Sequence, residues 1–244
     1  MIRPIAILAI AGLAVSAVSL SIAASLDRAP FVAAWPAWDR GIMQDACTGG
    51  AEQQSRELAW DGDGSRLDIG VPAVAQVEPG VERKIHVEGP AAAVQHLAMQ
   101  DGQLSFDGCL WNGSPGQLTI HVSGPSIRRF AVSGAGRLVL ERIDQPDIDI
   151  AIAGAGSIAG KGHAGEAKIR IAGAGKAELG ELAVERLTVR IAGSGRATVA
   201  PKDSADVRIA GSGDVRLATR PAHLTTRISG SGRIREAQSS STTP

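Results

Sequence analysis

The sequence is poor in aromatic residues and in cysteine. Its 244 residues include no tyrosine, three phenylalanines, four tryptophans and two cysteines. All of the tryptophans (Trp35, Trp38, Trp60 and Trp111) precede residue 127, and Phe130 is the only aromatic residue after residue 126. We therefore expect the tryptophans to anchor a core or a cap in the first half of the chain, with stacking on sugars as the alternative.

The sequence also lacks the common signatures of metal sites and of catalysis. It has no Cys-x-x-Cys or His-x-x-x-His pair, no Gly-x-Ser-x-Gly and no calcium-binding Gly-Gly-x-Gly-x-Asp repeat. Gly160, Gly162 and Gly165 satisfy Gly-x-Gly-x-x-Gly, but another strand pattern follows them where a dinucleotide site needs a helix. We expect no cofactor, no metal, no nucleotide and no enzymatic activity.

A short glycine motif recurs six times in the second half of the chain, at a spacing of 18 to 20 residues. Self-similarity at so short a period predicts a solenoid, in which each coil buries its apolar face against its neighbours. Glycine reaches positive φ without steric cost, so we expect these residues to make the sharp turn between two faces of each coil. The triplets are Gly134-Ala135-Gly136, Gly154-Ala155-Gly156, Gly173-Ala174-Gly175, Gly193-Ser194-Gly195, Gly211-Ser212-Gly213 and Gly230-Ser231-Gly232.

The segment before each triplet alternates apolar and polar residues, which is the period of a β-strand. The repeats therefore predict an all-β fold, a parallel β-helix with coils of about 19 residues. One inward column is expected to contain isoleucine in every coil: Ile152, Ile171, Ile191, Ile209 and Ile228. A second apolar stretch after each triplet is expected to form another face of the coil.

An outward column between the inward ones ends in four successive arginines. In full, the predicted column is His121, Ala131, Ala151, Arg170, Arg190, Arg208 and Arg227. Stacked like charges cost energy, so they need water, salt, nearby acids or a bound anion. One interpretation is a solvated face with acids nearby. The other is a binding face for anionic polymers such as acidic polysaccharide, lipopolysaccharide or nucleic acid, because Arg pairs bidentately with their anionic groups.

The triplets at a period near 19 residues, each after an extended Val/Ile strand, resemble the head domain of putative autotransporter adhesins, the GIN domain. The resemblance extends over about residues 120–234, with a degenerate copy at 120–124 that residues 84–90 echo. It implies an exported bacterial β-helix with a binding or adhesion role, and it carries over no catalytic residue. A purely structural envelope protein is the alternative, and a polysaccharide-acting enzyme is a second one.

The first 25 residues predict export to the periplasm or the cell surface. One arginine precedes an uncharged apolar run, and small residues follow it, as in a signal peptide. The run is long enough for an uncleaved anchor to be the alternative, which would be the only contact with the membrane. Residues 26–55 are expected to be a tether, in which Cys47 forms a disulfide with Cys109 unless both remain thiols.

The distribution of charged residues divides the chain into two halves. Residues 1–126 carry 7 Lys and Arg against 13 Asp and Glu, whereas residues 127–244 carry 18 against 12. Residues 56–126 predict a β-rich part that caps the solenoid, with strands near 66–69, 84–87 and 103–106 and a helical turn or two within 91–99. The repeat solenoid is expected over 127–236 and a disordered polar tail over 237–244. Beyond anionic polymers, an envelope protein is a candidate partner.

Overall fold

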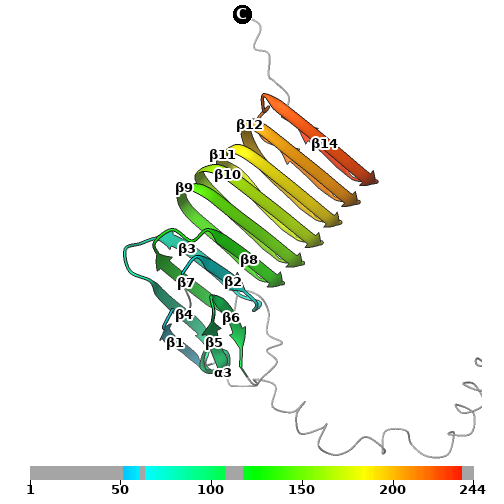
Figure 1. Ribbon diagram of the computed structural model, residues 1–244. Coiled ribbons are helices and arrows are strands. Elements are labelled where there is room, and N and C mark those ends of the chain that lie inside the picture. Colours follow the sequence, from blue (N-terminus) through cyan, green and yellow to red (C-terminus); the bar gives the residue numbers. More distant parts are fainter. Residues whose placement is uncertain (1–51, 61–63, 108–117, 238–244) are drawn as a thin grey trace, which may run out of the picture. The chain divides into compact units, whose positions relative to one another are not determined.

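The computed structural model describes residues 52–60, 64–107 and 118–237, all within one compact unit, residues 46–244. The chain winds into stacked coils that form a β-solenoid (Figure 1). The predicted fold class is therefore confirmed. Within the described part of the chain, no helix is long and apolar enough to cross a membrane.

Each coil of the repeat region is a single long strand or a pair of shorter strands. Every strand after β8 (Arg129–Gly134) starts just beyond a glycine triplet or ends at one, apart from a break in the last full coil. These strands are β9 (Arg137–Gly154), β10 (Ser157–Gly173), β11 (Lys176–Gly193), β12 (Arg196–Gly211), β13 (Asp214–Leu217), β14 (His223–Gly230) and β15 (Arg233–Glu236).

The triplets divide every coil into two faces. We call face A the segments that lead into the triplets, and face B the segments that follow them. Face A comprises residues 128–134, 147–154, 166–173, 186–193, 204–211 and 223–230; face B comprises 137–140, 157–160, 176–179, 196–199, 214–217 and 233–236. All of the pairings between neighbouring coils on both faces are parallel.

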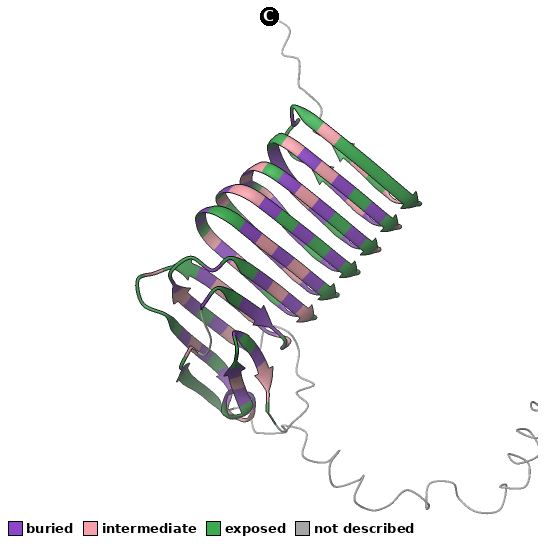
Figure 2. Cartoon of the chain, in the orientation of Figure 1, coloured by how far each residue is buried: buried purple, intermediate pink, exposed green. Residues whose placement is uncertain are grey.

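The register between coils aligns equivalent residues, as the repeats predict. On face A, Ile152, Ile171, Ile191, Ile209 and Ile228 are successive Cα partners. On face B, the residues after the triplets form a second inward column of Leu138, Ile158, Ala177, Ala197, Val215 and Ile234. Alternate residues are buried along most of the strands of β9 to β12 (Figure 2), so the core is a set of aliphatic ladders between the two faces.

The two glycines of each triplet are needed for different reasons. The first glycine of all six triplets has a positive φ, as predicted for the turn. The glycine at the third position faces an apolar side chain of the preceding coil: a Cβ on Gly195 would lie 2.5 Å from Cγ2 of Ile171. The first position therefore allows the turn, and the third allows the coils to stack closely.

The N-terminal part stacks its strands out of sequence order. Residues 66–79 form an early coil, with β2 (Arg66–Ile69) pairing with β8 on face A and β3 (Val74–Pro79) pairing with β9 on face B. A later stretch of chain lies beyond that coil, because β6 (Gln103–Phe106) pairs with β2 and β7 (Thr119–Gly124) pairs with β3. The coil at 66–79 thus lies between two segments that follow it in the sequence.

Antiparallel strands lie beyond these two coils. Strand β4 (Lys84–Pro90) pairs with β7, and β1 (Gln53–Leu58) pairs with β4. Helix α3 (Ala91–His96) follows β4 and leads to β5 (Leu97–Gln100), which pairs with β6. The likeness between 84–90 and 119–124 therefore marks two antiparallel neighbours and not two parallel coils. The strands expected near 66–69, 84–87 and 103–106 and the short helix are present.

The described residues reach only part of the predictions for the first half. Strand β1 begins at Gln53, inside the segment 26–55 that was expected to be a tether. Trp60 packs partly buried against the core, as expected for an anchor. The export segment, residues 238–244 of the predicted tail, the other tryptophans and the predicted Cys47–Cys109 disulfide lie outside the described residues.

The corner glycines give a test of the stacking. A Cβ on Gly193, where φ is +121°, would lie 2.5 Å from the carbonyl oxygen of Gly173, whereas one on Gly134, where φ is +87°, has no atom within 4 Å. Backbone strain of this kind costs on the order of 1–3 kcal/mol. We expect Gly134→Ala to lose about that much and Gly193→Ala to lose clearly more, in the free energy of unfolding measured with urea. Equal losses would show that contact between coils at the corner is unimportant.

Candidate functional site

The four predicted arginines form one row on face A. Arg170, Arg190, Arg208 and Arg227 are successive Cα partners in the ladders that join β10, β11, β12 and β14. Parallel strands are about 4.8 Å apart, so the backbone positions that carry the four arginines follow one another at about this spacing. Every one of these residues is exposed. We call this set the arginine row.

The start of the predicted column is wrong in one position. His121 lies on β7, opposite Gln76 of β3, and so belongs to face B. Asp68 of β2 instead precedes Ala131 and Ala151 in the column. Asp68 is buried, with Arg66 Nη2 at 3.1 Å from its Oδ2 and the hydroxyl of Ser133 donating to its Oδ1 at 3.4 Å. The column therefore runs from a buried carboxylate to four exposed cations.

Two members of the arginine row have carboxylate partners. Nη1 of Arg170 donates to both carboxylate oxygens of Asp149, at 2.8 and 3.0 Å. Arg208 Nη2 lies 2.7 Å from Oδ2 of Asp206, two residues earlier on the same strand. Both acids occupy the neighbouring outward column, so they neutralise the row from one side. Acids near the row were expected, and the structure shows which arginines they reach.

The other two members of the row, Arg190 and Arg227, form no ion pair with any described residue. The position two residues before each arginine, which holds aspartate for Arg208, is Thr188 for Arg190 and Thr225 for Arg227. Paired and unpaired arginines therefore alternate along the row. The backbone positions of Arg190 and Arg227 are two coils, or about 9.6 Å, apart.

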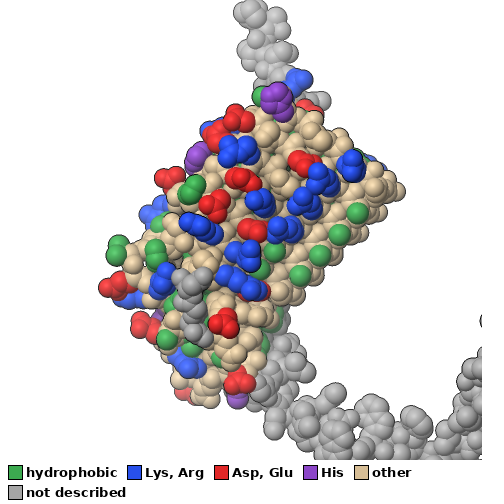
Figure 3. Space-filling model, viewed as in Figure 1, with side chains coloured by type: hydrophobic (Ala, Val, Ile, Leu, Met, Phe, Trp, Pro, Cys, Tyr) green, Lys and Arg blue, Asp and Glu red, His purple; other side chains and the backbone are tan. Residues whose placement is uncertain are grey.

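The surroundings leave the row accessible and positive. Counting the residues of face A, there are eight Lys and Arg against four Asp and Glu. Beside the row lies a stripe of exposed alanines, whose single methyl groups do not cover the guanidinium groups: Ala153, Ala172, Ala192 and Ala210. Figure 3 shows the basic side chains as a band across this face, with hydrophobic groups along its edge.

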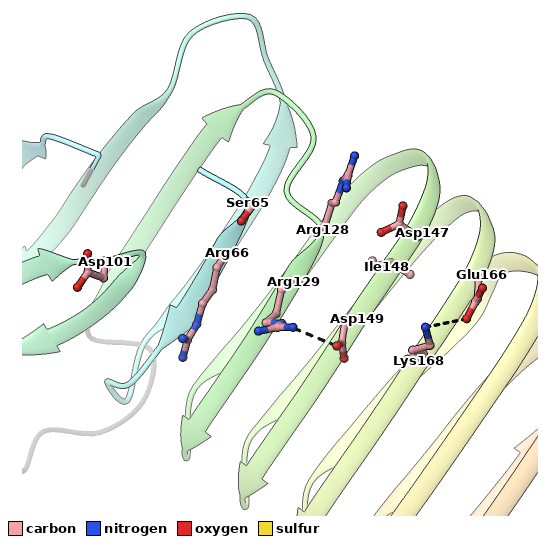
Figure 4. Close-up of a pocket in the computed structure, with 10 residues that line it drawn as sticks. All are labelled: Ser65, Arg66, Asp101, Arg128, Arg129, Asp147, Ile148, Asp149, Glu166 and Lys168. Carbon is pink, nitrogen blue, oxygen red and sulfur yellow. Dashed lines mark ion pairs between the residues drawn. The ribbon is translucent and has the colours of Figure 1, made fainter. Parts of the chain in front are cut away.

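A charged cleft of about 820 Å³ adjoins the row where face A meets the N-terminal part. Four basic and four acidic side chains line it, together with Ser65 and Ile148 (Figure 4). Asp149 lies at its centre, with Arg129 Nε 3.8 Å from its Oδ2, and Lys168 Nζ lies 2.9 Å from Oε1 of Glu166. The charged lining residues are Arg66, Asp101, Arg128, Arg129, Asp147, Asp149, Glu166 and Lys168.

The cleft brings together carboxylates on adjacent coils, which the sequence analysis did not anticipate. Glu166 lies opposite Asp147, and Lys168 lies opposite Asp149. The hydrogen bond and the charge of Lys168 lower the pKa of the Glu166 carboxyl, against a small opposing effect of burial. A general acid that works near neutral pH needs a raised pKa, whereas the pKa of this carboxyl is lowered. Among the described residues, no three His, Cys, Asp or Glu side chains are grouped so that they could hold a metal ion.

Comparison with protein families gives a match over most of the solenoid. The family described as "Putative auto-transporter adhesin, head GIN domain" matches residues 65–221, which is more than half of the chain. The chain belongs to this family. Comparison with curated proteins found no match. The matched region thus includes β2 and β3, the out-of-order coil, and the repeats as far as β13; β14 and β15 lie beyond it.

One solved structure shares the fold of this GIN domain, and two others align less well. A putative adhesin from Bacteroides fragilis aligns with a TM-score of 0.61 at 18% identity, over 77% of this chain and 98% of that chain. A putative adhesin from Parabacteroides distasonis aligns at 18% identity with a TM-score of 0.48, over 78% and 98% of the two chains. A putative lipid binding protein from Parabacteroides distasonis aligns at 17% identity with a TM-score of 0.48, over 78% of this chain and 98% of that chain.

The pairing pattern predicts how the row contributes to stability. Arg190 has like charges on both sides and no acid, so Arg190→Ser should change the free energy of unfolding by at most about 0.5 kcal/mol. Asp149→Asn removes the partner of Arg170 and Arg129 and should cost up to about 1 kcal/mol, less at high salt. Chemical denaturation at low and high salt measures both. A larger loss from Arg190→Ser than from Asp149→Asn would contradict this pattern.

Proposed function

We propose that this GIN-domain chain is an exported, non-catalytic binding module of the bacterial envelope, and that the arginine row binds anionic polymers. The observation that carries the proposal is the alternation along the row. Arg190 and Arg227 extend from a rigid sheet without a carboxylate partner among the described residues. A guanidinium group in that state is free to form a charge-assisted, bidentate contact with a carboxylate, sulfate or phosphate.

The geometry favours a polymer over a small anion. The row is straight, because the strands are in register, and its unpaired members are about 9.6 Å apart. A chain of anionic groups at a similar spacing can therefore contact both at once. An acidic polysaccharide or a lipopolysaccharide surface presents repeated charges of this kind, and an exported family of adhesins would meet both.

The cleft supports binding in preference to hydrolysis. Two of its four carboxylates, Asp149 and Glu166, have basic partners, and the lowered pKa of Glu166 keeps this group ionised at neutral pH. A polysaccharide hydrolase needs a protonated carboxylic acid beside a carboxylate. We therefore expect no release of reducing ends when the protein is incubated with acidic oligosaccharides. Accumulation of reducing ends that Glu166→Gln abolishes would establish the enzyme alternative.

Binding to a sulfated or carboxylated polysaccharide tests the arginine row. Arg190→Ser should weaken binding by roughly tenfold, since a hydrogen bond to a charged group contributes about 1.5 kcal/mol. Arg196→Ser is the matched control: Arg196 is an exposed arginine on face B, at the start of the next coil. Titration calorimetry at low and high salt compares the two variants with the unaltered chain.

The unaltered chain and Arg196→Ser should bind alike, and their affinity should fall with salt because the contact is ionic. Arg190→Lys should recover part of the loss, since a lysine keeps the charge without the bidentate geometry. Equal weakening by Arg190→Ser and Arg196→Ser would mean that only net charge matters, and would contradict a defined row. An absence of binding to every anionic polymer tested would favour a structural protein.

A further inference from the structure

The two ends of the solenoid are built differently. At the N-terminal end, antiparallel strands β4 and β1 continue the sheet on face B, and β5 with α3 lies beyond β6. At the C-terminal end, β14 pairs only with β12 and β15 only with β13 among the described strands. Figure 1 shows β14 as the outermost strand of that end. An uncovered strand edge is a template for another strand.

The backbone of β14 presents donors and acceptors at this edge. In a parallel ladder, alternate residues direct their N–H and C=O groups to opposite neighbours. The N–H of Ser231 donates back to Gly211. By alternation, Arg227 and Thr225 also face β12, whereas Leu224, Thr226 and Ile228 direct their backbone groups away from the solenoid.

The same three residues carry the inward side chains of the last coil. Ile228 is 42% exposed, although its equivalents in the preceding coils, Ile171, Ile191 and Ile209, are each 2% exposed. Leu224 is partly buried against the core. Among residues 52–60, 64–107 and 118–237, nothing pairs with this edge of β14 or covers the apolar ladder that ends there.

We propose that this edge pairs with β14 of a second copy of the chain, antiparallel, about a two-fold axis through Thr226. In this register Leu224 of each copy lies opposite Ile228 of the other, so apolar side chains cover one another. Thr226 lies opposite Thr226, and each of these pairs exchanges two backbone hydrogen bonds, whereas the pair of Thr225 with Arg227 between them does not. Apolar side chains stay on the core side, because directly opposite residues point to the same face of the sheet.

The two neighbouring registers are less favourable, one because of charge and the other because of where β14 begins. A shift by two residues in one direction places Arg227 opposite Arg227 of the second copy, which like-charge repulsion disfavours. A shift in the other direction places Ile228 opposite Ala222, which lies beyond the start of β14 at His223. The register centred on Thr226 instead places Arg227 opposite the neutral Thr225. It is the one that matches both charge and apolar surface.

This contact closes the assembly at two copies. A two-fold contact uses the same edge on both chains, so it occupies the open edge of β14 in each copy, and pairing through that edge cannot extend into a filament. Its axis is perpendicular to face A, so both arginine rows lie on the same side of the dimer. A polymer bound to both rows would gain from bivalency. The pairing itself does not depend on which ligand the arginine row binds.

Cysteine cross-linking tests the register. The full chain is expressed in a bacterial host as Thr225→Cys and, separately, as Arg227→Cys, and the two are mixed under mild oxidation. Thr225 and Arg227 of different copies are directly opposite and lie outside the hydrogen-bonded pairs, at about 4.5 Å between Cα atoms. A cross-linked dimer should form in the mixture and be much weaker in either preparation alone. The unaltered chain controls for the native cysteines.

Sedimentation of the full chain over a range of concentrations tests the dimer itself. The unaltered chain should form dimers, and Ile228→Lys should be monomeric, because it places a charge in the contact. Val81→Lys is the matched control, since Val81, at 97%, is the other exposed large apolar residue in the described part of the chain. It should leave the dimer unchanged, and circular dichroism should show that both variants are folded.

Three results would overturn the proposal. The first is a monomeric unaltered chain at every concentration. The second is a dimer that persists in Ile228→Lys and fails to cross-link in the mixture. The third is a monomer that dimerises only when residues 238–244 are removed, which would make that segment the occupant of the edge. None of these results changes whether Arg190→Ser weakens binding of a polyanion, so the dimer and the proposed function fail separately.

Discussion

The structure depends on close, in-register contact between coils at the glycine corners. A Cβ at the third position of a triplet would strike an inward side chain of the preceding coil, as Gly195 would strike Ile171. With glycine there, each isoleucine fits under the next turn and the apolar ladders stay aligned. The same alignment fixes every outward column, because side chains alternate along a strand. The surface chemistry of face A is therefore a consequence of the corner.

The repeats made most of the solenoid predictable from the sequence. The period located the coils, alternation assigned the inward columns, and both placed Arg170, Arg190, Arg208 and Arg227 in one row. The order of the N-terminal coils was not predictable in this way. His121 was assigned to the wrong face because its segment resembles a repeat, while β7 pairs with β3, which is not its neighbour in sequence. A pattern within one strand does not specify its partner when strands stack out of order.

The ion pairs of the arginine row and the cleft could not be predicted from the sequence, because both depend on where the side chains lie in the folded protein. The sequence showed acids near the row but not which arginines they pair with, because ion pairs form both between coils and along a strand. Arg170 reaches Asp149 on the preceding coil, whereas Arg208 pairs with Asp206 on its own strand. The cleft depends on the junction between β2, β8 and the repeats, so no local motif indicates it. Within it, Lys168 lies 2.9 Å from Glu166 and lowers the pKa of that carboxyl.

We propose that a single row of arginines on face A contacts an anionic polymer. The NMR spectrum of the arginine Nε–H groups, recorded during titration with a sulfated oligosaccharide, detects this contact. We expect the signals of Arg190 and Arg227 to shift first and furthest, with smaller shifts for Arg170 and Arg208, which have carboxylate partners. The face B arginines Arg196 and Arg216 should not move. Equal shifts on both faces, or shifts confined to face B, would contradict it.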